Sequence, residues 1–174
     1  MMSIAWRRTC RVVGWARDRI GMTTVGRSKE SGIQQQLVRR YFHEILDQGQ
    51  IELIEEIFHP QCVLHRPGGT VMGIDSVRGV AERRKETFSQ FETQIHDMFG
   101  SEDRLVARLT HRGLGGGIWR SRLGQCDVTG KAVTWNAIAI FRFESQRIVE
   151  EWVARDELAI ILQFGLLEPA RAVR

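Results

Sequence analysis

Residues 131–156 read KAVTWNAIAIFRFESQRIVEEWVARD, and this stretch decides the fold. Apolar side chains occupy every odd position from 133 to 143, which predicts a strand over residues 132–143 with one wholly apolar face. The other face carries Ile138 and Ile140 and is therefore also partly apolar. After a four-residue turn, residues 148–154 are expected to pair with this strand as its antiparallel neighbour. A strand covered on both faces suits a bent sheet with a helical layer on one side.

Helical periodicity dominates the region before the strands. Apolar residues at helical spacing from position 33 to 45 predict an amphipathic helix that ends near Gly49, and a second short helix is expected over residues 51–58. A third helix is predicted over residues 77–90, with Asp75 and Ser76 as its cap. The outer face of this third helix is expected to hold the charged residues Glu82, Arg83, Arg84 and Lys85.

Short apolar runs between turn residues predict the remaining elements. Strands are expected at residues 62–65, 93–98, 105–112 and 118–126, and a last helix at residues 157–164. Helices followed by antiparallel strands indicate an α+β fold rather than an alternating α/β fold. We expect a cone-shaped curved antiparallel sheet packed on about three N-terminal helices, with a small-molecule pocket in the concavity between them. This domain is predicted to span residues 32–168, before a C-terminal tail at 169–174.

The overall composition is that of one globular domain. The chain has 174 residues, of which 43% are hydrophobic. Its longest mostly apolar stretch, residues 158–167, falls short of the ~20 residues that a membrane-spanning helix needs, so we expect no membrane partner. Cys10, Cys62 and Cys126 form neither a disulfide framework nor a metal knuckle, which favours a reducing, cytoplasmic location. The five histidines lack metal-ligand spacing, so no metal is expected.

Positive charge is concentrated at the start of the chain. Residues 1–29 carry a net charge of +6, whereas residues 30–174 carry −2. The body therefore offers no basic stripe for phosphates, and binding to nucleic acid is disfavoured. Three interpretations of a basic leader at residues 1–31 stay open: a disordered extension or misassigned start with Met22 as the alternative, a targeting leader, or a basic arm for an acidic partner.

Several short motifs occur in an order that is familiar as a whole. They are HP (59–60), CVLH (62–65), TH (110–111), TGK (129–131), RIVEEW (147–152), Asp156 and QFG (163–165). Together they resemble the SnoaL-like polyketide cyclase family, within the nuclear transport factor two-like superfamily, over roughly residues 33 to 167.

This resemblance implies a cone-shaped α+β fold and a range of activities. The family includes cyclases that close a ring by intramolecular aldol condensation without a cofactor. The superfamily also holds isomerases, epoxide hydrolases, dehydratases and noncatalytic ligand binders. Cyclase chemistry needs a carboxylate or imidazole to move a proton in a mostly apolar pocket, so no cofactor is expected. Relatives commonly pack their sheets face to face, which implies a homodimer.

Three pocket positions depart from the cyclases that the chain resembles. Val153 stands where the resemblance places the acid/base Asp, and Ala137 and Ala139 stand where it places a Gln and a His on the preceding strand. With Trp135 and Phe141 as further walls, the pocket is expected to be larger and more apolar than in a cyclase. A small hydrophobic ligand is therefore predicted.

Four polar residues are candidates for proton transfer. Glu151 shares the strand parity of Val153 and lies either in the cavity or at a solvated edge. Asp156 either caps the last helix or lies at the cavity mouth. His65 and His111 have side chains that suit a general base near neutral pH, and each is otherwise a hydrogen-bonded structural histidine.

Two functions remain open on the sequence. The first is a cofactor-independent cyclase, isomerase or hydrolase of a polyketide- or terpenoid-like substrate, with Glu151, Asp156, His65 and His111 as proton carriers. The second is a noncatalytic module for hydrophobic ligands or dimerisation, which the valine at position 153 favours. In both, the predicted ligand contacts are Trp119, Trp135, Ala137, Ala139, Phe141 and Val153, although the tryptophans could equally belong to the core.

Overall fold

A computed structural model of the chain describes residues 29–121 and 124–167. The predicted basic leader at residues 1–31 lies outside the described residues except for its last three positions, and so does the predicted tail at 169–174. Among the helices of the described part, none is long and apolar enough to span a membrane.

The first helical layer forms as the sequence predicts. α1 (Lys29–Arg40) runs directly into a π-helical segment, η1 (Tyr41–Asp47), and the chain turns at Gly49, which adopts a φ of +76°. Such a positive φ is inexpensive only for glycine, so the helix ends there. A 3₁₀ turn, η2 (Ile51–Leu53), and α2 (Ile54–Ile57) then form the predicted second short helix.

The third helix, α3 (Ile74–Thr87), begins earlier than predicted. Its cap is Gly73, which has a φ of +83° and makes no side-chain capping bond. The expected cap at Asp75 and Ser76 is therefore wrong. The Ser76 hydroxyl instead donates to the backbone carbonyl of Met72 at 2.7 Å, because the helix has already started at this point.

The main sheet has six strands in the order β2-β1-β8-β7-β4-β3. Their bounds are β1 (Phe58–Arg66), β2 (Gly69–Met72), β3 (Phe88–Ser101), β4 (Arg104–Gly115), β7 (Ala132–Glu144) and β8 (Arg147–Arg155). All neighbours are antiparallel except β1 and β8, which pair in parallel. β1 can run beside β8 because the whole of α3 and three long strands separate them in the chain.

The strand predicted over residues 118–126 is wrong as a single element. It is a separate two-stranded hairpin of β5 (Ile118–Ser121) and β6 (Gly124–Asp127). Gly124 has a φ of +116°, which breaks an extended run at this point. The last helix, α4 (Glu157–Gln163), ends before Gly165 as predicted.

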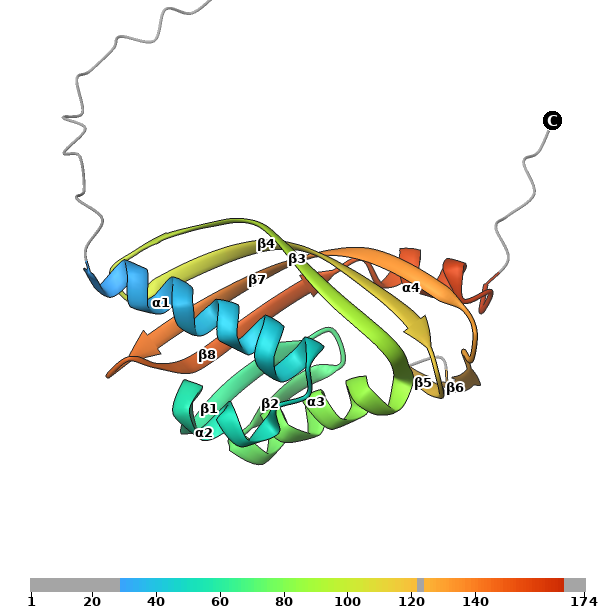
Figure 1. Cartoon of the computed structure of the whole chain (residues 1–174), viewed down its shortest axis with the longest axis horizontal. Coiled ribbons are helices and arrows are strands. Elements are labelled where there is room, and N and C mark those ends of the chain that lie inside the picture. The colour runs from blue at the N-terminus through green and yellow to red at the C-terminus, as the bar shows by residue number, and fades with distance from the viewer. Residues whose placement is uncertain (1–28, 122–123, 168–174) are drawn as a thin grey trace, which may run out of the picture.

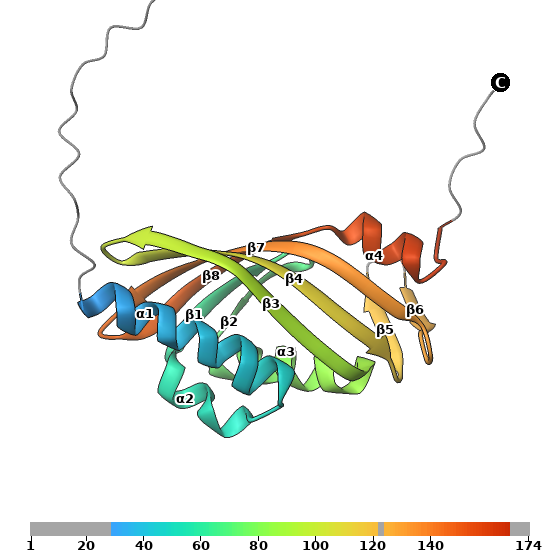
Figure 2. The same ribbon diagram turned by 45° about the horizontal axis from the view of Figure 1, so that its top comes forward.

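The long strands bend around the N-terminal helices. Figures 1 and 2 show β3, β4, β7 and β8 as a curved sheet with α1, α2 and α3 on its inner side and the β5-β6 hairpin at one end. Odd-numbered residues of β7 are buried from 133 to 143, as the alternation predicts. The predicted α+β fold, a curved sheet on three N-terminal helices, is confirmed.

The inner face of the sheet packs into two clusters. The larger one joins the N-terminal helices to the sheet, with Phe141 against the rings of Tyr41 and Phe42 at centroid distances of 6.2 and 6.0 Å. The smaller one is largely aromatic and includes Phe88 and Trp135. On the outer face of β7, Ile138 is 49% exposed, and the homodimer that would cover it stays a prediction.

Replacement of Phe141 by alanine should strongly destabilise the fold. The side chain is fully buried, so Phe141→Ala should lower the free energy of unfolding by about 3–5 kcal/mol in urea titrations. Ile138→Thr on the opposite face of the same strand is the control and should cost less than about 1 kcal/mol. Equal losses for the two variants would contradict the assignment of faces.

Candidate ligand cavity

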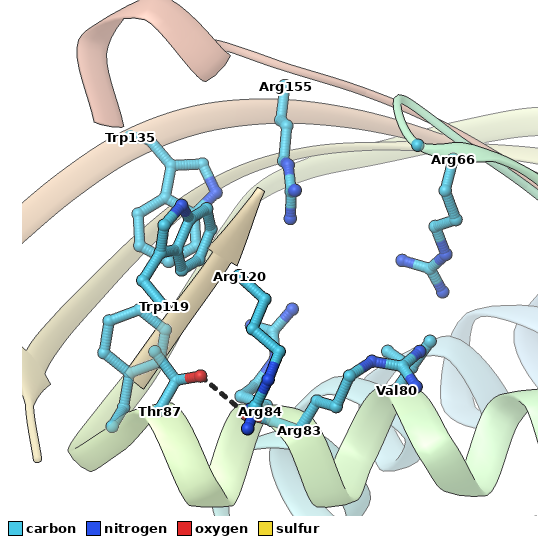
Figure 3. A pocket seen from close by; sticks show the side chains of 11 residues that line it. Arg66, Val80, Arg83, Arg84, Thr87, Trp119, Arg120, Trp135 and Arg155 are labelled. Atoms are coloured by element: carbon cyan, nitrogen blue, oxygen red, sulfur yellow. Dashed lines mark hydrogen bonds between the residues drawn. The ribbon is translucent and has the colours of Figure 1, made fainter. Parts of the chain in front are cut away.

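A cavity of about 250 Å³ lies between the inner face of the sheet, α3 and β5 (Figure 3). Three aromatic side chains form one side of it: Phe88, Trp119 and Trp135. Five arginines form much of the rest: Arg66, Arg83, Arg84, Arg120 and Arg155. None of the described residues that line this cavity is acidic. The cavity is therefore both aromatic and strongly cationic.

The strand and helix periodicity that places apolar side chains in the core also places these arginines on the inner side of the fold. Arg155 faces Ala137 across β8 and β7, so it lies on the inner face of the sheet. Arg84 follows the buried Val77 and Ala81 at helical spacing on α3. Figure 3 shows arginine side chains entering from the sheet, from α3 and from β5 and pointing toward one space.

A close backbone approach sets the aromatic side of the cavity. A Cβ atom on Gly113 of β4 would lie 2.6 Å from Cδ1 of Phe88, so only glycine leaves room for this ring. The Phe88 ring in turn packs against Trp135 at 5.8 Å and Trp119 at 6.2 Å. These rings give a flat ligand an apolar surface to stack on.

Arg66 has protein partners within the core. Its Nη2 donates to the Tyr41 hydroxyl at 3.0 Å and to Oε2 of Glu151. Glu151 is 1% exposed, and burial raises the pKa of its carboxyl while the Arg66 charge opposes that rise. Burial also raises the pKa of Tyr41 to about 12. Glu151 is thus a partner of Arg66 behind the cavity wall, with no position on the cavity surface itself.

Arg84 has no carboxylate partner among the described residues. Its guanidinium carbon lies 4.1 Å from the centre of the Phe91 ring, which covers one face of the group. Burial lowers the pKa of Arg84 to about 10; the charges of Arg66 and Arg155 act in the same direction, and Tyr41 and Asp47 oppose them. At neutral pH the side chain is therefore a cation that contacts no carboxylate in the described part of the chain.

Several buried polar atoms in and behind the wall of this cavity have no hydrogen-bond partner. In the described part of the chain, four buried side-chain polar atoms have no hydrogen-bond partner: Arg66 Nε, Arg84 Nη1, Trp119 Nε1 and Glu151 Oε1. Three are N–H donors, and all three belong to residues that line the cavity. Native proteins seldom leave buried donors unpaired, so a group that accepts hydrogen bonds is expected there.

His111 belongs to a buried chain of hydrogen bonds. The Thr93 hydroxyl donates to Asp47 Oδ1 at 2.7 Å, so it must accept at its oxygen from Nδ1–H of His111, 3.0 Å away. Burial, with lesser contributions from Arg84, Arg155 and Arg66, lowers the pKa of His111 to about 2. The imidazole is thus neutral, with its proton on Nδ1. Its ring lies 5.2 Å from Trp135, next to the cavity.

The structure does not bring the four predicted proton carriers together. Asp156 caps α4 by accepting from the Ala159 N–H at 2.9 Å, which is the capping alternative. His65 lies on the outer face of the sheet, where its Nε2 is 2.9 Å from Glu150 Oε1. His65 is thus the hydrogen-bonded histidine of the two alternatives, because Leu64, its neighbour on β1, is the buried residue and alternation turns position 65 outward.

The predicted ligand contacts divide between the cavity and the core. Trp119 and Trp135 line the cavity. Ala139 and Phe141 belong instead to the fully buried cluster under the N-terminal helices, as does Ala137, and Val153 packs against that cluster. None of these four residues lines this cavity, because α1 and η1 cover this part of the sheet, although Ala137 and Asp156 line a second, more open pocket.

The cavity arginines were missed in the sequence. Arg84 was expected on the outer face of α3, but the stripe of Val77, Ala81 and position 84 already predicts an inward side chain. Arg155 and Arg66 share strand parity with Val153 and Leu64, respectively. A charged residue at a position where the periodicity predicts a buried side chain was therefore the sequence signal that could have identified these arginines.

No three histidine, cysteine, aspartate or glutamate side chains lie close enough to hold a metal ion within residues 29–121 and 124–167.

The family model for SnoaL-like polyketide cyclases matches residues 36–164, which is most of the chain. This chain belongs to the SnoaL-like polyketide cyclase family. The family expected from the short motifs is thereby confirmed. No curated protein sequence matches the chain significantly.

Solved structures share the fold at low sequence identity. TsrD from Streptomyces laurentii is 23% identical with a TM-score of 0.70, over 78% of this chain and 97% of its own. IdmH from Streptomyces antibioticus, a proposed polyketide cyclase, is 20% identical with a TM-score of 0.63, over 76% and 98%. An epoxide hydrolase of M. tuberculosis is 12% identical with a TM-score of 0.60, over 78% and 91%. At these identities the likeness establishes the fold alone.

The low pKa of His111 should make the fold sensitive to acid. Below about pH 6.5 the unfolded chain binds a proton at this position that the folded chain does not, so stability falls as the pH falls. The slope from this group should be about 1.4 kcal/mol per pH unit. Urea titrations between pH 6.5 and 4.5 measure it. His111→Asn, which keeps a donor for Thr93, should lose this part of the slope, and an unchanged slope would contradict the account.

Proposed function

We propose that this SnoaL-family protein binds a small organic molecule in the cavity between the sheet, α3 and β5. The ligand has a flat unsaturated part, which stacks on the aromatic side, and oxygen atoms that accept hydrogen bonds on the arginine side. A polyketide-like molecule combines both features. The single observation that carries the proposal is the composition of the cavity wall, in which five arginines and three aromatic rings meet and no acidic residue of the described part takes part.

The size of the cavity supports a small ligand. Its volume of about 250 Å³ lies just below the ~300–1,000 Å³ of drug-sized sites, so a molecule of one or two rings fits best. The rings of Trp119 and Trp135 supply the apolar contact that the sequence predicted for a hydrophobic ligand. The arginines add a requirement for polar acceptors that an entirely apolar ligand would leave unmet.

A second candidate is proton-transfer catalysis on the same ligand. It is favoured by the chain from Asp47 through Thr93 to His111, which leaves the Nε2 lone pair of a neutral imidazole beside Trp135. Such an imidazole can act as a general base once a substrate carbon acid or hydroxyl is within reach. Arginine donors would then stabilise the oxyanion that forms. Glu151 and Asp156 are held by Arg66 and by the α4 backbone, and we give them no role in this step.

Native mass spectrometry separates the two candidates. The purified chain is measured alone and after incubation with a small-molecule extract of its own source cells. A captured molecule that is released unchanged supports a binding protein, and one that is released as a rearranged or hydrated product supports an enzyme. In the second case His111→Asn should abolish turnover while still retaining the molecule. Failure to retain any molecule would contradict the proposal.

A bulky side chain in the cavity should prevent binding. Val80 lines the cavity on α3, so Val80→Trp should fill it and weaken retention of the captured molecule at least about tenfold. Val71→Trp on the exposed strand β2 is the matched control and should leave retention unchanged. Circular dichroism confirms that both variants fold. Undiminished retention by folded Val80→Trp would place the ligand elsewhere.

A further inference from the structure

We infer that the ligand of this cavity is an organic anion, a flat aromatic or conjugated molecule whose carboxylate or equally acidic oxygen group binds the guanidinium of Arg84. The inference rests on the proposed function, because it names the chemical class of the ligand for that same cavity. It adds an acidic group to the small hydrophobic ligand that the sequence predicts.

The cavity wall carries more positive than negative charge. Three of the lining arginines have carboxylate partners: Arg66 binds Glu151, Arg155 lies 2.6 Å from Glu157, and Arg120 lies 3.5 Å from Glu86 at an exposed position. Arg84 has no such partner in the described part of the chain, and no acidic residue there lines the cavity. The wall therefore lacks a negative charge that a ligand can supply.

The Arg84 guanidinium is held in an orientation that suits an anion. Phe91 covers one face of the guanidinium, while the buried Nη1 atom in its plane has no partner. Guanidinium donors lie in this plane and match the two oxygens of a carboxylate. Arg84 thus brings a planar guanidinium, covered on one face by Phe91, to the wall of the cavity, where an anion can bind it.

The Arg84 cation lowers the stability of the protein when no anion is bound. A buried charge without a counter-charge destabilises a fold, so a purely structural position would favour an apolar side chain of similar length. Arg84 occupies the stripe of α3 that also holds Val77 and Ala81, where apolar residues are expected. An arginine at this position is explained if it binds an anionic ligand, although it makes the ligand-free protein less stable.

The aromatic rings decide between an organic anion and a small inorganic one. Phe88, Trp119 and Trp135 form a continuous cluster on one side of the cavity. Free phosphate would meet the arginines and leave this surface without contact. A planar acid satisfies both sides at once, with the ring on the aromatic cluster and the acidic group at Arg84.

Two probes of the same shape test the inference. Isothermal titration calorimetry measures the dissociation constants of 2-naphthoate and of the neutral 2-naphthamide at pH 7.5. We expect the carboxylate to bind at least about tenfold more tightly than the amide, as a charge-assisted hydrogen bond predicts. Inorganic phosphate should compete weakly. Equal affinities for the two probes, or tighter binding of phosphate than of naphthoate, would overturn the inference.

Two arginine variants with the same change in net charge locate the effect. Arg84→Met should weaken naphthoate binding by about 10- to 100-fold and leave naphthamide binding nearly unchanged. Arg112→Met is the control, because Arg112 is exposed on β4 and its Nη2 donates to Gln94 outside the cavity. It should leave both affinities unchanged. Equal losses for the two variants would show a general effect of charge and overturn the inference.

Thermal unfolding separates a binding role from a structural one. Arg84→Met should unfold at the same temperature as the wild type or higher, because it removes a partly buried cation that contacts no carboxylate in the described part of the chain. A clearly lower unfolding temperature would make Arg84 a structural residue and overturn the inference. The proposed function can fail separately from this inference. If the protein retains an uncharged molecule from the extract but does not bind naphthoate, only the inference of an anionic ligand is overturned. If it retains no molecule and does not bind naphthoate, the proposed function and the inference are both overturned.

Discussion

One face of β7 has to serve two purposes, and the rest of the structure follows from this constraint. At one end, Phe141 closes a dense core with Tyr41 and Phe42 from the helical layer. At the other end, Trp135 is the wall of a cavity beside α3 and β5. The sheet must bend between these two regions, and the small side chains of Ala137 and Ala139 lie at this point of the strand. Packing at the first end supplies the stability that lets the second end stay hollow.

The hollow end is dominated by charge. A pair of opposite charges, Arg66 and Glu151, is buried behind it, and Tyr41 links this pair to the core. Arg84 extends into the same space from α3 and contacts no carboxylate in the described part of the chain. Burial lowers the pKa of its guanidinium to about 10. Because the same arginine also lowers the pKa of His111, an anion that neutralised it would make the imidazole a stronger base. The charge of the ligand would then affect the basicity of His111.

The sequence predicts the fold well because the decisive signals are local. Alternation identifies β7, and glycines at 49 and 165 end their helices where the backbone needs a positive φ. What the sequence misses depends on contacts between distant segments. The parallel pairing of β1 with β8 has no local signature, and the break at Gly124 needs the hairpin partner to be recognised.

The site was harder to predict than the fold for a physical reason. The resemblance directed attention to carboxylates and histidines, yet Asp156 caps a helix and His65 faces outward. The functional character of the cavity comes from arginines that interrupt apolar stripes, and Arg84 in particular reads as a surface residue until the register of α3 is followed. Periodicity fixes which face a residue occupies, but only the tertiary structure shows whether that face meets a core or a cavity.

A crystal structure of the protein with 2-naphthoate tests the central claim most directly. The account predicts electron density for the ring between the Trp119 and Trp135 side chains and α3, with a carboxylate oxygen about 3 Å from a guanidinium nitrogen of Arg84. Density for the naphthoate at another surface, or a cavity in which Arg84 pairs with a protein carboxylate and only water is bound, would contradict it.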